Sequence, residues 1–183
     1  MTKQDFLNAA NAAALAASRT SGFPAGITVA QAALESNWGN SQLARDAHNY
    51  FGIKAHGAHE RVSYPTFECV SGKTIRVTAD FACYHSMAEC FADRDRLIAA
   101  VGCYAEARAC RDNPTAFARA LAKHWATDPQ YAEKLLRVYR ENDLDHLDVE
   151  KPSALSTLPT KSGLAITDSP AKQISNLRTE LIR

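Results

Sequence analysis

Apolar residues recur every three or four positions through much of this chain, the spacing that places side chains on one face of a helix. Residues 3–19 are rich in alanine and follow this spacing, with Thr2 in the position of an N-cap. The run 27–39 is strongly apolar and predicts a buried helix that ends at Gly39. A short helix is predicted to begin near Ser41.

The pattern changes after Gly52. Residues 74–81 alternate strictly between polar and apolar side chains, which is typical of a half-buried strand. Residues 62–69 can pair with this strand, and Ser71-Gly72 supplies suitable turn residues. We therefore expect a small β-hairpin inserted between helices.

Helical patterns resume in the second half of the chain. Ser86 and Glu89 form a capping-box pattern at the start of a helix that runs to about residue 100. Asn113-Pro114 and Asp128-Pro129 each place a proline at a first helical position, so two more core helices should start there. The elements together predict an α+β fold that is mainly α, with a helical body and a small hairpin lobe.

The pattern weakens beyond Asn142 into serine, threonine, proline and lysine. We expect one domain over residues 1–142 and a C-terminal segment over residues 143–183. Residues 143–169 are predicted to be a linker or a strap on the domain. Ser169-Pro170 can start a short tail helix that docks on the core, and a membrane-active tail is the alternative.

Composition narrows the classes of partner. The chain has 183 residues, with 21 lysines and arginines against 20 aspartates and glutamates, so no overall charge attracts nucleic acid or an anionic membrane. It contains no run of 18 apolar residues, and its start does not resemble a signal peptide. We expect no nucleic-acid binding, no stable membrane insertion, and a monomer whose partner is recognised by a cleft.

The cysteines and histidines do not indicate a metal site. The five cysteines form no C-x-x-C pair, and most of them should be buried small apolar residues. Cys69 and Cys83 flank the hairpin and are the pair to test for a disulfide. His56 and His59 share a loop, but two histidines without a carboxylate at ligand spacing are a weak signal. We expect neither a metal nor a cofactor.

One carboxylate stands near the end of the apolar second helix. Glu35 lies at the edge of a stripe formed by Ile27, Leu34 and Trp38. A carboxyl group where an apolar wall meets a cleft has a raised pKa, so it can donate a proton near neutral pH, as the general acid of glycoside cleavage must. The alternative is a glutamate in the last turn that points to water, and the spacing leaves both open.

Four pieces of sequence resemble a known family. They are ITVAQAALESNWG (27–39), SQLAR (41–45), NYFGIKA (49–55) and ATDPQYAEKL (126–135). In this order they resemble glycoside hydrolase family 73, whose members are endo-β-N-acetylglucosaminidases that cut the glycan of bacterial cell walls. The resemblance covers roughly residues 23–142. It implies a lysozyme-like fold with a cleft beside the hairpin lobe, and peptidoglycan glycan strands as the partner.

The resemblance supports Glu35 as the acid and suggests further catalytic residues. Glu68 is similar in position to the family's acidic residue in the hairpin, which is proposed to activate water, and an exposed strand-end acid is the alternative. Asp93 resembles a position discussed as catalytic, although Arg94 and Arg96 beside it favour a solvated charged face. Tyr131 matches the tyrosine of a Tyr-Ala-x-Lys motif, where its phenol could hold a sugar N-acetyl group or a carboxylate, or simply pack in the core.

The same resemblance implies that Asn49, Tyr50 and Phe51 line the cleft. Trp38 could bind substrate too, although a tryptophan directly before a glycine at a helix end is more often a core anchor. Inversion and substrate assistance stay open as mechanisms.

Three functions are compatible with this resemblance: a glucosaminidase, a muramidase or lytic transglycosylase on the same fold, and an inactive wall-binding module. Without a recognisable signal peptide, the protein is expected to be made in the cytoplasm and to reach the wall by another system, in a phage, flagellar or injector context.

Overall fold

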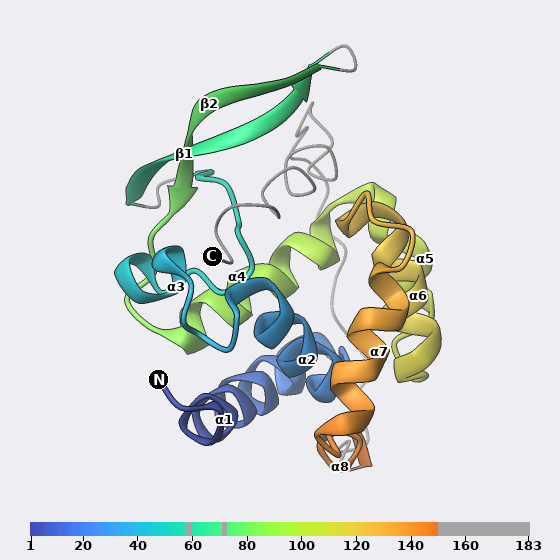
Figure 1. Ribbon diagram of the computed structural model, residues 1–183. Coiled ribbons are helices and arrows are strands. Elements are labelled where there is room, and N and C mark those ends of the chain that lie inside the picture. The colour runs from blue at the N-terminus through green and yellow to red at the C-terminus, as the bar shows by residue number, and fades with distance from the viewer. Residues whose placement is uncertain (58–59, 71–72, 150–183) are drawn as a thin grey trace.

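The computed structural model describes residues 1–57, 60–70 and 73–149, and for residues 67–70 and 73–75 it describes the backbone only. Helices form a body from which one antiparallel hairpin projects (Figure 1). This is the expected mainly helical α+β fold. The elements are α1 (Lys3–Ser21), α2 (Ala25–Ser36), α3 (Gln42–Ala47), β1 (Arg61–Val70), β2 (Lys73–Ala82), α4 (Met87–Ala100), the 3-10 helix η1 (Gly102–Tyr104), α5 (Ala105–Ala109), α6 (Pro114–Trp125), α7 (Tyr131–Glu141) and α8 (His146–Val149).

The helix starts largely follow their local signals. The Thr2 side chain accepts a hydrogen bond from the Asp5 amide in a full capping box. The Ser41 and Asn113 side chains each accept one hydrogen bond from the backbone of the helix they cap, α3 and α6. At α4 the Ser86 hydroxyl accepts from the Glu89 amide. The Glu89 carboxylate accepts from the amide of residue 85 rather than from that of Ser86, so the predicted capping box is displaced by one residue.

Helix α7 starts later than predicted. The Asp128 carboxylate accepts a hydrogen bond from the Gln130 amide at 2.9 Å, and the Asp128 carbonyl accepts from the Tyr131 amide at 3.0 Å. These bonds close a turn, so Pro129 lies in that turn and the helix begins at Tyr131. Three short elements, η1, α5 and α8, were not predicted from the sequence.

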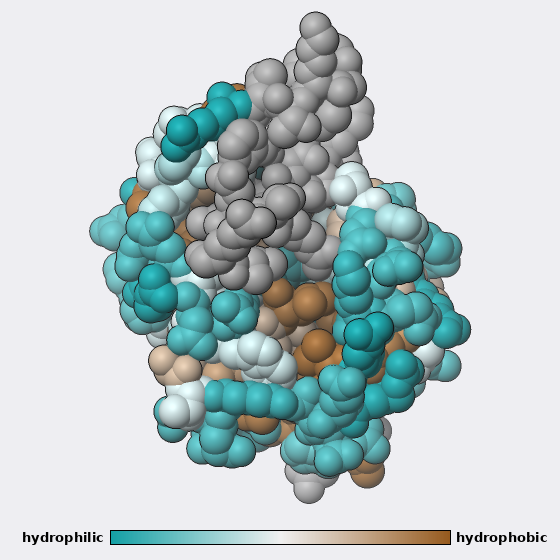
Figure 2. All heavy atoms as spheres, in the orientation of Figure 1, coloured by the Kyte–Doolittle hydropathy of each residue, from teal (hydrophilic) through white to brown (hydrophobic). Residues whose placement is uncertain are grey.

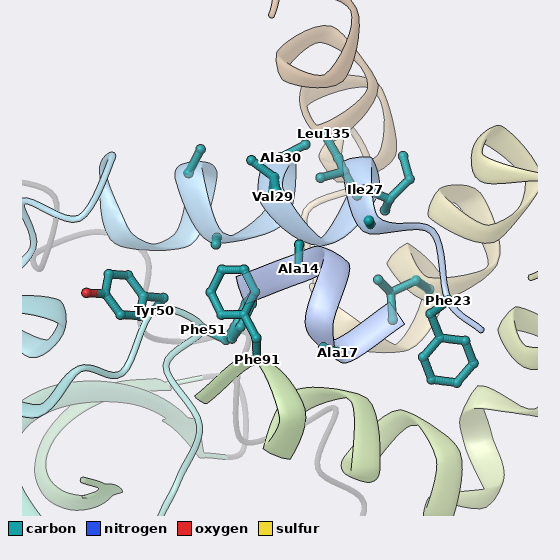
Figure 3. Close-up of a cluster of buried hydrophobic side chains, with 14 of the residues drawn as sticks. Ala14, Ala17, Phe23, Ile27, Val29, Ala30, Tyr50, Phe51, Phe91 and Leu135 are labelled. Carbon is teal, nitrogen blue, oxygen red and sulfur yellow. The ribbon is translucent and has the colours of Figure 1, made fainter. Parts of the chain in front are cut away.

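Helix α2 lies at the centre of the body. Residues 25–33 are all buried, and α2 packs against α1, α6, α7 and α8. Figure 3 shows Ala14 of α1 and Leu135 of α7 on opposite sides of α2, near Val29 and Ala30. Because so many of the facing residues are alanines, the helix backbones can approach closely, and the apolar run of α2 is thereby removed from water on every side.

The packed body continues to α8. Leu144 and Leu147 are buried, and the Asp148 carboxylate accepts hydrogen bonds from the Gly26 amide at 3.1 Å and the Tyr139 hydroxyl at 2.9 Å. A Cβ atom at Gly26 would overlap the Leu144 carbonyl, so only glycine permits this approach. The first part of the predicted linker, residues 144–148, is therefore packed on the body. Its remainder and the tail helix lie outside the described residues, and a boundary at residue 142 stays a prediction.

The hairpin is attached to the body through a small core of its own. Leu43 and Ala47 of α3 pack against Ala79 and Phe81 of β2. The Tyr64 hydroxyl of β1 donates to the Asp46 carboxylate of α3 at 2.7 Å, and this bond, after burial, raises the Tyr64 pKa to about 12. The root of the hairpin is thus fixed to α3.

The register of the hairpin contradicts the suggested disulfide. Cys69 is paired with Thr74 near one end of the hairpin, whereas Cys83 follows the other end of β2. At about 3.3 Å per strand residue the two backbones are about 30 Å apart, far beyond the reach of a disulfide. Cys83 is a free thiol. The disulfide was suggested because the two cysteines flank the hairpin in the sequence, but the partners of a disulfide must lie opposite each other across the two strands.

Candidate active site

Glu35 lies in the last turn of α2, directly before a sharp reversal of the chain. Asn37, Trp38 and Gly39 follow with φ values of 50°, 56° and 73°. The Ser36 hydroxyl stabilises this turn, since it accepts from the Gly39 amide at 2.8 Å and donates to a carbonyl in α2 at 2.6 Å. Two successive non-glycine residues in the left-handed region cost roughly 1–2 kcal/mol each. The backbone is therefore strained immediately after the candidate acid, as is common at functional sites.

The Glu35 carboxylate is bound to a tyrosine from the opposite half of the chain. The Tyr131 hydroxyl donates to Glu35 Oε1 at 2.6 Å, a length typical of a bond to a charged oxygen. Tyr131 is fully buried at the start of α7, whereas Glu35 is half-buried. The sequence left Tyr131 open between a core residue and a partner of a carboxylate. The structure shows that it is both.

The surface around this helix pair suits a general acid. Figure 2 shows apolar surface gathered in a hollow at the centre of this face, between the parts of the molecule formed by α2 and by α7. Glu35 is half-buried, so a fully solvated side chain is not what the structure shows. Its role as the general acid stays a prediction.

A buried arginine holds the helix that carries Glu35. Arg94 of α4 is completely buried, and its Nε and Nη2 donate to the Gln31 side-chain carbonyl at 3.0 and 2.7 Å. Its Nη1 donates to Thr28 at 2.9 Å and to the Asp95 carboxylate at 2.7 Å. Gln31 lies one turn before Glu35 on α2. This role of Arg94 was not predicted, because the charged residues around it in the sequence indicate a solvated face, although a glutamine within an apolar helix was a usable signal.

Asn49, Tyr50 and Phe51 do not line a cleft in this structure, so that prediction is corrected. The Asn49 side chain, 1% exposed, donates to the carbonyls of Ile53 and Ala82 at 2.8 and 2.9 Å. Phe51 packs on an α4 phenylalanine with ring centroids 5.0 Å apart, and Tyr50 is 5% exposed (Figure 3). These motif residues build the junction between body and hairpin.

Trp38 is half-buried against the core. Its ring meets the Phe6 ring edge-on with centroids 5.8 Å apart, and Lys3 Nζ lies 4.6 Å from its centroid. These contacts favour the core-anchor interpretation. A contact between Trp38 and substrate stays a prediction.

Asp93 is buried rather than solvated, which corrects the sequence interpretation. Its carboxylate accepts from the Tyr84 hydroxyl at 2.8 Å and from Arg96 at 2.9 Å, and His56 Nε2 lies 3.3 Å away. Burial acts to raise the Asp93 pKa, but the bonds from His56, Tyr84 and Arg96 outweigh it and hold the pKa well below its usual range. A carboxylate held in this way is a poor base, so Asp93 does not fit the role of activating water.

Glu68 cannot be placed in the site. Its backbone lies in β1 opposite Ile75, but its side chain lies outside the described residues. Its catalytic role stays a prediction. Within the part of the chain that is described, no group of three histidine, cysteine, aspartate or glutamate side chains is arranged to hold a metal ion. No helix in that part is long and apolar enough to cross a membrane.

Known proteins resemble this chain over most of its length. It is 35% identical to the exo-glucosaminidase LytG of Bacillus subtilis over 144 residues, which cover 71% of this chain and 48% of LytG. It is also 35% identical to the peptidoglycan hydrolase FlgJ of Salmonella typhimurium over 147 residues, which cover 75% of this chain and 46% of FlgJ. The chain thus spans less than half the length of either relative.

The fold is shared with solved structures of wall hydrolases. The catalytic domain of the autolysin Auto from Listeria monocytogenes superposes with a TM-score of 0.73 and 29% identity, over 80% of this chain and 87% of that domain. The glucosaminidase family, described as mannosyl-glycoprotein endo-beta-N-acetylglucosaminidase, matches residues 11–144. The resemblance found in the sequence is confirmed: the chain belongs to the glucosaminidase family, glycoside hydrolase family 73.

Proposed function

We propose that this domain hydrolyses the β-1,4 bond between N-acetylglucosamine and N-acetylmuramic acid in peptidoglycan, with Glu35 as the general acid. The bond between Tyr131 and Glu35 at the junction of α2 and α7 carries this proposal, because it orients one half-buried carboxyl group. Membership of the family supports the reaction class. The names of the relatives, an exo-glucosaminidase and a peptidoglycan hydrolase, support the substrate class.

In the proposed reaction the Glu35 carboxyl proton moves to the glycosidic oxygen as the bond to the anomeric carbon breaks. Glu35 is then a carboxylate, and the Tyr131 hydroxyl already points at one of its oxygens and stabilises the new charge. Water adds to the anomeric carbon and loses its proton to a base. We propose Glu68 as that base, with attack by the substrate's own acetamido group as the alternative.

Replacing Tyr131 by phenylalanine tests the role of the tyrosine. We expect kcat on purified sacculi to fall by about tenfold, because the variant keeps the ring in the core but loses the hydroxyl that orients Glu35. Tyr104→Phe is a matched control, since that tyrosine is also fully buried and its hydroxyl has no hydrogen-bond partner among the described residues. Equal rates for the two variants would remove Tyr131 from the mechanism.

Replacing Glu68 by glutamine tests the second carboxylate. If Glu68 activates water, the variant should lose most of its activity, by about a hundredfold. A variant that keeps activity within a few-fold of wild type would instead favour substrate assistance. Circular dichroism of the variant must match wild type before the rates are compared.

Mass spectrometry of the products released from sacculi tests the proposed bond. Reducing-end N-acetylglucosamine is the expected product. A reducing-end or anhydro N-acetylmuramic acid would make the protein a muramidase or a lytic transglycosylase. Binding to sacculi without release of any sugar would make it a wall-binding module.

The proposed place of action follows from the substrate. We propose that the protein acts on the bacterial wall, and that it does so as a monomer. Size-exclusion chromatography with light scattering tests the monomer.

A further inference from the structure

The Asp93 carboxylate joins the two ends of the hairpin lobe. Tyr84 lies just after β2, and its hydroxyl is 2.8 Å from Asp93 Oδ2. His56 lies in the loop that leads toward β1, and its Nε2 is 3.3 Å from the same oxygen. Arg96 holds the other carboxylate oxygen at 2.9 Å. A single buried carboxylate on α4 therefore contacts both the entry and the exit of the lobe.

The His56 ring is placed so that its protonation decides whether both of its contacts form. Nε2 faces the Asp93 carboxylate, and Nδ1 lies 3.1 Å from the Lys54 carbonyl oxygen. Both partners are acceptors, and a neutral imidazole carries only one N–H. Only the protonated ring can donate to both. The ring is also 44% exposed, so it can exchange its proton with water.

The segment just before His56 is already part of the lobe. Lys54 forms a β-bridge with Phe81, and the Ala55 amide donates to the Asp80 carbonyl at 2.9 Å. His56 follows this short pairing directly, and Gly57 then turns the chain with a φ of 58°. A bond from His56 to α4 therefore fixes the point at which the lobe begins.

We propose that Asp93 and His56 form a proton-dependent latch that holds the hairpin lobe against α4, and that Asp93 is a positioning residue for catalysis rather than the base. The inference deepens the proposed function, because the lobe is the part of the chain that carries Glu68. Its consequence is that the placement of the lobe depends on the charge of a histidine 75 residues before Tyr131 in the chain.

The charges around the ring define the pH range of the latch. Among the described residues, His56 faces Asp93 and Arg96 of α4 and the Lys54 carbonyl of its own loop. Tyr84 donates to Asp93, and the buried thiol of Cys90 lies near enough to feel the Asp93 charge. The bond to Asp93 is the largest influence and raises the His56 pKa, although burial and Arg96 oppose it.

The direction of the pH dependence follows from these shifts. Since the His56 pKa is raised, the ring is charged below that pKa and both of its contacts form. As the pH rises through it, the ring keeps one N–H, the ion pair with Asp93 is lost and the latch weakens. At the acid end, Asp93 has a lowered pKa, so its contribution is lost only as the pH falls through that low value. The closed range therefore covers mildly acidic to near-neutral pH.

The first test follows the imidazole signals of the full-length wild-type protein by NMR during a pH titration, and it needs no substrate. The His56 midpoint should lie at a higher pH in the wild type than in Asp93→Asn, because the bond to Asp93 raises the His56 pKa. If His56 titrates at the same pH in both proteins, the latch is wrong, whatever reaction the protein catalyses.

The second test compares rates on sacculi for wild type and His56→Gln at each pH. The ionisation of the catalytic acid affects both proteins equally, so the ratio of their rates reports the protonation of His56 alone. Because glutamine can donate to Asp93 but never carries charge, we expect wild type to be faster by roughly three- to fivefold at pH 5.5 and equal to the variant at pH 8.5. His85→Gln should match wild type throughout.

A ratio of wild type to His56→Gln that does not change with pH would overturn the latch even if both proteins cut the wall. Conversely, products from a different bond would revise the proposed function without changing the His56 titration. The two proposals can therefore fail separately.

Discussion

Replacing Glu35 by glutamine is expected to lower the rate of wall hydrolysis at least about a hundredfold, the usual size of general acid catalysis. Glutamine keeps the shape of the side chain and can still accept the hydrogen bond from Tyr131. It cannot deliver a proton to the leaving oxygen. The fold and the affinity for sacculi should therefore stay as in wild type, while turbidity clearance is lost.

Glu141→Gln is the matched control for this experiment. Glu141 is exposed at the end of α7, and the substitution makes the same change in charge away from the hollow. It should clear sacculi at the wild-type rate. Clearance by Glu35→Gln at that same rate would show that the acid is another residue.

Replacing Arg94 by alanine is expected to lower the free energy of unfolding by about 3–5 kcal/mol. The substitution removes a fully buried guanidinium and leaves the Asp95 carboxylate, 4% exposed, without its partner in α4. Gln31 and Thr28 of α2 also lose their donors. Urea unfolding followed by circular dichroism measures the loss.

Two further variants separate the buried charge from the general effect of removing an arginine. Arg119→Ala breaks an exposed pair with Glu133, both more than half exposed, and should cost less than about 1 kcal/mol. Arg94→Met with Asp95→Asn removes both buried charges together and should recover part of the loss. An Arg94→Ala variant as stable as Arg119→Ala would mean that water reaches the site and hydrates Asp95.

Local signals predicted most of the secondary structure. Thr2 and Asn113 cap their helices through bonds that span only three residues, and the alternation in β2 needs only its partner strand. The failures are also local in origin. Pro129 carries the signal for a helix start, but the bonds of Asp128 close a turn there first.

The contacts of the candidate site could not be read in the same way, because they join distant segments. Glu35 and Tyr131 are 96 residues apart, so motif matching named both without showing that they touch. In the sequence, Arg94 and its charged neighbours predict a solvated face. The buried role of Arg94 becomes clear only in the structure, where Gln31, 63 residues earlier in the chain, lies beside it. Burial of a charge depends on the partner that tertiary packing supplies, and a linear pattern does not contain that partner.

The hydrogen bonds of Asn49 bear on how far the hairpin lobe can change without a change in the helical body. The Asn49 side chain binds the carbonyls of Ile53 and Ala82, and the Ala82 amide also donates to the Ile53 carbonyl at 3.0 Å. The whole of residues 54–81 is thereby an insertion whose two ends meet at one point. Closing a longer loop costs little more free energy than closing a short one, since that cost rises only with the logarithm of length. The helical body, with its acid, can therefore accept hairpins of different length without being rebuilt, as long as the residues that pack on α3, such as Phe81, are kept.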